Sequence, residues 1–70
     1  MPYDLDNLFE YHPPTPEQKD KYINIRSAAK SFARTLIANT PAGADQAAAI
    51  RKLREAVMTA NAAIALDGKL

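Results

Sequence analysis

The chain has 70 residues and a formal net charge of +1, with one histidine and no cysteine. This composition excludes disulfides and thiolate metal sites, and a single histidine cannot build a zinc site unless several carboxylates converge on it. A chain this short buries only about 60% of the surface that it exposes when unfolded, so we expect it to be stabilised by association with other copies of itself.

The charge balance and the apolar pattern exclude several functional classes. A reader of duplex nucleic acid normally carries a clear basic excess, and no apolar run approaches the roughly 20 residues that span a membrane. The acidic start "MPYDLDNLF" lacks the basic region of a signal peptide. The eight acidic residues form no pair spaced for acid–base catalysis, and there is no glycine-rich phosphate loop. We therefore expect a binding protein without a cofactor, not an enzyme.

Residues 1–14 are expected to form a short helix followed by a proline-rich arm. Leu5, Leu8 and Phe9 have the i, i+3, i+4 spacing of one helical face, and Asp4 can cap this turn. The sequence "YHPP" ends the helix, because a residue before proline is pushed out of the α region. Two successive prolines favour a stiff, extended connection.

A complete start signal predicts a long helix over residues 15–40. Thr15 is the expected N-cap, Pro16 occupies the first helical position, and Gln18 closes a capping box. The helix should end in "ANTPAG", because Pro41 cannot continue it. Its apolar seam alternates steps of three and four residues: Tyr22, Ile25, Ala29, Phe32 and Leu36.

A second long helix is predicted over residues 44–67, with Gly68 and Lys69 as its stop signal. Its seam has the same spacing: Ile50, Leu53, Val57, Ala60 and Ile64. Two helices of about 35 Å, joined by a short loop, predict an antiparallel hairpin. The expected fold is therefore all-α, with a short N-terminal helix and a long two-helix hairpin in a single domain of residues 1–70.

Alanines surround the second long helix, which allows two interpretations. Alanine is the best helix former, so the composition can reflect helix propensity alone. Small side chains also permit close approach by other helices on more than one face. Because a lone hairpin cannot cover both sides of its seam, we favour the second interpretation and expect a homo-oligomer.

Several cations have no partner at helical spacing. Arg26, Lys30 and Arg34 follow one another at i, i+4 and i+8, with no acid three or four positions away. They can form a solvated face, pair with acids of another subunit, or bind an anion such as phosphate. Arg51 can pair with Glu55 along the helix.

Arg54 has only apolar or basic neighbours at spacings of three and four. It is expected either to extend into water or to meet a ligand or partner. Asn61 lies among small apolar residues and is expected to be an amide satisfied at an interface, in preference to a reader of bases.

The stretch "EYHPPTPEQ" places Tyr11 and His12 on stiffened backbone. A ring held in this way can stack on a nucleobase, or Tyr11 can pack across the hairpin as an apolar lid. His12 can hydrogen-bond to a helix end or contact a ligand.

The segments "YHPPTPEQKDKY", "IRSAAKSFA" and "NTPAGADQAAAIRKLREAVMTANAAIA" resemble small phage proteins of the anti-CBASS sponge family. Their helical hairpin domain also occurs in phage sponges directed against Thoeris immunity. The likeness covers roughly residues 8–66. It implies a homo-oligomer, expected to be a hexamer, that acts in the cytoplasm of the infected bacterial host. There it would sequester cyclic oligonucleotides without cleaving them.

The resemblance also implies binding residues. Family members hold cyclic dinucleotides between subunits, with a tyrosine on the bases and a basic residue on the phosphates. Tyr11 matches the first role, with His12 beside it, and Arg26 followed by Lys30 matches the second. Some members hold cyclic trinucleotides at a symmetry axis through an arginine of the second helix. The candidates for that role are Arg51 and Arg54.

A different class of function remains open at this point. The chain can be a helical oligomer that caps or inhibits a host protein and has no small ligand. This alternative explains the alanines and Arg54 equally well, but it leaves Arg26, Lys30 and Arg34 without a role.

Overall fold

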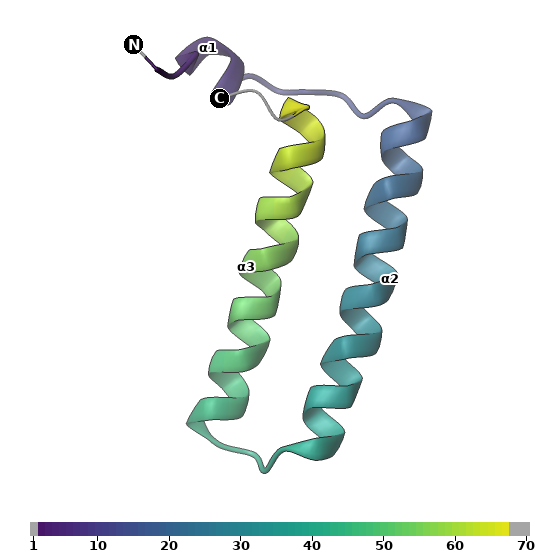
Figure 1. The fold of residues 1–70 in the computed structure, drawn as a ribbon, viewed down its shortest axis with the longest axis vertical. Coiled ribbons are helices and arrows are strands. Elements are labelled where there is room, and N and C mark those ends of the chain that lie inside the picture. The colour runs from purple at the N-terminus through teal and green to yellow at the C-terminus, as the bar shows by residue number, and fades with distance from the viewer. Residues whose placement is uncertain (1, 68–70) are drawn as a thin grey trace.

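The structure, a computed structural model, describes residues 2–67. It contains three helices, α1 (Leu5–Leu8), α2 (Pro16–Asn39) and α3 (Ala44–Leu66), and no strand within the described range. Helices α2 and α3 lie side by side as an antiparallel hairpin (Figure 1). Helix α1 lies beyond the end of α3, and the arm that follows it runs across this end of the hairpin to the start of α2. The expected all-α fold, with a short helix before two long ones, is confirmed.

Local caps fix where the first two helices begin. Asp4 Oδ1 accepts a hydrogen bond from the backbone N–H of Asn7 at 3.1 Å, which caps α1. At the start of α2, Thr15 Oγ1 accepts from the N–H of Gln18 at 3.2 Å, and Gln18 Oε1 accepts from the N–H of Thr15 at 3.0 Å. Both the Asp4 cap and the capping box predicted from the sequence are therefore present.

Gln18 has a second role that the sequence does not indicate. Its Nε2 donates a hydrogen bond to the carbonyl oxygen of Ile64 at 3.1 Å, across a separation of 46 residues. Ile64 lies in the last turn of α3, where carbonyl groups lack partners within the helix. One side chain therefore caps the start of α2 and ties it to the end of α3.

Polar contacts also define the remaining helix ends. In the α2–α3 loop, Gln46 Nε2 donates to the carbonyl oxygen and to Oγ1 of Thr40, each at 3.1 Å. Asp67 takes the left-handed conformation, with φ 52°, and its N–H bonds back to Ala63 and Ile64. The predicted stop residues Gly68 and Lys69 lie outside the described residues.

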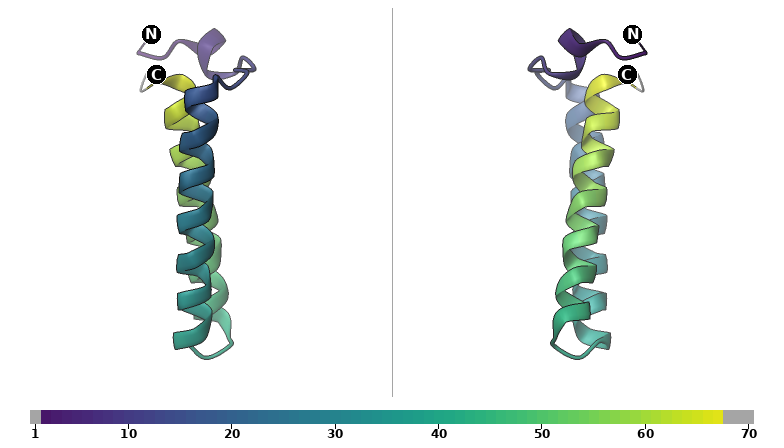
Figure 2. Two further views of the ribbon diagram at one scale, coloured as in Figure 1. Left: turned by 90° about the vertical axis from the view of Figure 1, so that its right-hand side faces the viewer. Right: turned by 90° about the vertical axis from the view of Figure 1, so that its left-hand side faces the viewer.

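The hairpin is a single layer of helices without a closed core. The extents of the whole molecule are 44 × 29 × 15 Å, and no residue within 2–67 is buried. Figure 2 shows the two long helices nearly eclipsing each other from the side. Most of the predicted seam is half-buried, but Phe32 is 53% exposed. It lies at the edge of the seam, which one neighbouring helix alone cannot cover.

The tie through Gln18 predicts a measurable contribution to stability. Gln18→Ala removes both the capping contact and the bond to Ile64, and should lower the free energy of unfolding by about 1–2 kcal/mol. Gln18→Glu keeps a capping-box side chain but removes the donor to Ile64, so it should cost about 1 kcal/mol. Urea unfolding at one fixed protein concentration measures both changes.

The neighbouring exposed residue provides the matched control. Lys19→Ala should change stability by less than about 0.5 kcal/mol. A Gln18→Glu variant as stable as the unchanged protein would show that the bond to Ile64 contributes nothing.

Candidate functional site

Three of the predicted cations meet in one groove on a flank of the hairpin. This basic groove has a volume of about 320 Å³ and takes Arg26 and Lys30 from α2 and Arg54 from α3. Apolar side chains, among them Ala29 and Leu53, form its floor. Its size falls at the lower end of the range for small-molecule sites, about 300–1,000 Å³.

The grouping of the cations follows from helix geometry. Residues at i and i+4 lie one above the other on a helix, so Arg26 and Lys30 share a side of α2. The antiparallel register brings Arg54 opposite them. Met58, one turn beyond Arg54, also lines the groove, and no sequence signal had singled it out.

These cations are available to an external anion. All three are exposed, and none takes part in a side-chain hydrogen bond within residues 2–67. Like charges close together repel, and a bound phosphate relieves that repulsion. Arginine presents a planar fork that matches phosphate oxygens, and lysine a compact point charge.

Two other basic residues of interest lie outside the groove. Arg34 is one turn beyond Lys30 on α2, and Arg51 precedes Arg54 by three residues on α3. Both side chains are exposed, and neither lines the basic groove. The structure therefore separates Arg51 from Arg54, which the resemblance treats as alternatives for one role.

Tyr11 and His12 occupy the arm between α1 and α2, away from the basic groove. The Tyr11 side chain is 81% exposed and so does not form an apolar lid. His12 is half-buried, and its Nε2–H donates to the carbonyl oxygen of Asn7 at 2.7 Å. Arg26 lies ten residues after Pro16, about 15 Å along α2 at 1.5 Å per residue. In one copy of the chain, the arm and the groove are therefore separate surfaces.

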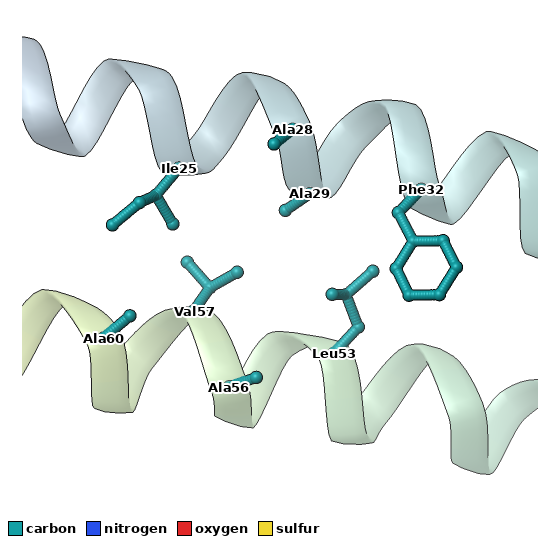
Figure 3. A pocket seen from close by; sticks show the side chains of 8 residues that line it. All are labelled: Ile25, Ala28, Ala29, Phe32, Leu53, Ala56, Val57 and Ala60. Atoms are coloured by element: carbon teal, nitrogen blue, oxygen red, sulfur yellow. The ribbon is translucent and has the colours of Figure 1, made fainter.

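The opposite flank of the hairpin is apolar. A second groove of about 400 Å³ opens there, with Ile25, Ala28 and Phe32 on α2 facing Ala56 and Ala60 on α3 (Figure 3). Ala29 lines both grooves. Viewed down the axis of α2, Ile25, Ala28 and Phe32 lie on one side of Ala29. Arg26 and Lys30 lie on its other side. We call this second surface the apolar groove.

Asn61 has a buried polar atom without a partner. Its Oδ1 accepts no hydrogen bond within residues 2–67. The amide predicted to be satisfied at an interface is thus not satisfied inside one copy of the chain. A buried acceptor left in this state costs about 1–3 kcal/mol, so a donor from outside the hairpin would stabilise the protein.

None of the helices between residues 2 and 67 is both long and apolar enough to cross a membrane. The same residues contain no group of three or more His, Cys, Asp or Glu that could hold a metal ion.

Comparison with known proteins gives one match. The family model described as "Acb2/Tad1, hairpin domain" matches residues 1–65, which is nearly the whole chain and includes α1, the arm and both long helices. No match was found among curated proteins or among solved structures. The chain therefore belongs to the Acb2/Tad1 hairpin-domain family, the anti-CBASS and anti-Thoeris sponges, whose role at the level of the family is to bind cyclic oligonucleotides.

Proposed function

We propose that this protein binds cyclic oligonucleotide second messengers and sequesters them without cleavage. It would thereby suppress CBASS-type signalling in the cytoplasm of an infected bacterium. The observation that carries the proposal is the convergence of Arg26, Lys30 and Arg54 in one groove. Family membership supports the ligand class.

The chemistry of the two surfaces suits a cyclic dinucleotide. Its two phosphates carry two negative charges, which Arg26 and Lys30 can neutralise with charge-assisted hydrogen bonds. Its bases offer flat faces to an aromatic ring, and the exposed Tyr11 ring is free to stack on one.

The proposed active form is a homo-oligomer, expected to be a hexamer. The apolar groove supports this proposal, because Ala28, Ala56 and Ala60 allow another helix to approach closely. Association would also bring Tyr11 of one copy toward Arg26 of another, which a single copy keeps apart. A cyclic trinucleotide would bind at a symmetry axis through Arg54, with Arg51 as the second candidate.

Paired substitutions test the dinucleotide site. Tyr11→Ala removes a stacking contact that is typically worth about 1–3 kcal/mol per base, so calorimetry should show dinucleotide binding weakened by roughly tenfold to a hundredfold. Arg26→Glu should weaken it at least as much, because it replaces attraction to phosphate with repulsion.

Two residues supply controls of the same type outside the proposed site. Tyr3→Ala removes another exposed aromatic of the N-terminal segment, and Arg34→Glu reverses a charge on the same helix outside the groove. Both should bind nearly as well as the unchanged protein. Equal losses of dinucleotide affinity in Arg26→Glu and Arg34→Glu would indicate that the ligand is attracted by the net charge of the protein, and would contradict the proposed dinucleotide site.

Sequestration predicts that the ligand is recovered intact. After incubation with a cyclic dinucleotide and denaturation of the protein, mass spectrometry should recover all of the ligand in cyclic form. Linear dinucleotide or mononucleotide in the released fraction would contradict storage.

The apolar groove predicts where association can be broken. Ala56→Arg places a long charged side chain in the groove and should reduce the subunit number observed by native mass spectrometry. Ala47→Arg is the control, because Ala47 is exposed on the same helix and does not line the groove. An Ala56→Arg protein with an unchanged subunit number would contradict this interface.

The apolar groove also favours the second candidate, an interaction module that caps or inhibits a host protein. That candidate predicts no heat when cyclic di- and trinucleotides are titrated into the protein. If any of these ligands gives heat of binding, and the Arg26→Glu variant loses that heat, the result favours the cyclic-oligonucleotide sponge.

A further inference from the structure

A hydrogen bond folds the N-terminal arm back onto α1. His12 Nε2–H donates to the carbonyl oxygen of Asn7 at 2.7 Å, and the His12 ring is half-buried, although Tyr11 and Pro13 on either side of it are exposed. The bond closes the chain from Asn7 to His12 into a loop. Tyr11 lies inside this loop, directly before the residue that anchors it.

The bond is chemically well defined. A carbonyl oxygen can only accept, so Nε2 must carry the proton, and the other ring nitrogen is left free. Asn7 belongs to the four-residue helix α1, in which the Leu5 carbonyl accepts from the N–H of Phe9. The other carbonyl groups at the end of so short a helix lack partners within it. His12 thus satisfies one of these groups and fixes the arm at the same time.

The arm is constrained on the other side of Tyr11 as well. Pro13 and Pro14 restrict the backbone after His12, and Thr15 then begins the capping box of α2. The Tyr11 side chain itself is 81% exposed, so packing against the rest of the chain does not hold its ring. The backbone constraints around Tyr11 are therefore what limits where the ring can lie.

We propose that His12 is a positioning residue for Tyr11: it bonds to Asn7, and this bond holds the arm in the conformation that presents the tyrosine ring to a base. The inference rests on the proposed function, because it assumes that Tyr11 stacks on the ligand. It gives His12 a role different from the direct ligand contact that the sequence leaves open. Without the bond, only a fraction of the molecules would hold the ring correctly, and the apparent dissociation constant rises in inverse proportion to that fraction.

Substitutions of His12 test this role through dinucleotide affinity. His12→Ala removes the donor and should weaken binding roughly threefold to tenfold, the factor that one net hydrogen bond represents. His12→Gln supplies an amide N–H near the position of Nε2 and should restore affinity to within about twofold. In a Tyr11→Ala background, His12→Ala should cause no further loss, because the residue acts through the tyrosine.

The outcomes separate the inference from the proposed function. If Tyr11→Ala weakens binding and His12→Ala does not, the positioning role is wrong and the proposed function stands. If neither variant changes binding, the stacking role of Tyr11 and the positioning role of His12 both fail, whereas a complete absence of dinucleotide binding by the unchanged protein would overturn the proposed function itself. If His12→Ala costs the same with and without Tyr11, His12 contacts the ligand directly, and the positioning role is overturned.

A measurement on the unchanged protein avoids any effect of substitution on folding. Nuclear magnetic resonance of ¹⁵N-labelled histidine should show the proton on Nε2 in the neutral ring of the free protein. A neutral ring protonated on Nδ1 instead would rule out the bond to Asn7 and overturn the inference.

Discussion

Two helices in contact have only one seam between them, and this limit governs the rest of the structure. The molecule extends only 15 Å in its thinnest direction, because its two long helices form a single layer. Side chains at the centre of the seam are therefore no more than half-buried. Each flank must remain in water or be covered by something else, because residues 2–67 contain no further long helix or strand that could cover it.

The chain gives its two uncovered flanks opposite chemistry. On one flank, side chains that end in positive charge surround a narrow apolar floor. On the other, alanines alternate with larger apolar residues. The first suits an anion and the second suits another helix, so the same pair of helices can serve recognition and association without competition for surface. The arm adds a third exposed feature at the end of the hairpin, where Tyr11 lies.

Signals that act within a few residues made the helices predictable. The cap at Asp4, the capping box at Thr15 and the break at Pro41 each depend on neighbours in sequence. The grouping of Arg54 with Arg26 depends instead on how α2 and α3 are aligned, which periodicity within one helix does not specify. The bond from Gln18 to Ile64 was not predictable for the same reason, because the two residues are 46 positions apart in the sequence. The ligand roles of the site residues remain predictions.

The double use of Gln18 has a consequence for how the protein opens. Helix ends ordinarily fray independently, each at its own local cost. Here the first turn of α2 and the last turn of α3 share one amide side chain, so melting either end withdraws support from the other. Thr15, at which the arm joins α2, shares the capping box with Gln18, so this attachment of the arm is only as durable as the weaker of the two helix ends. Cooperative opening of the two helix ends therefore depends on the side chain of a single glutamine.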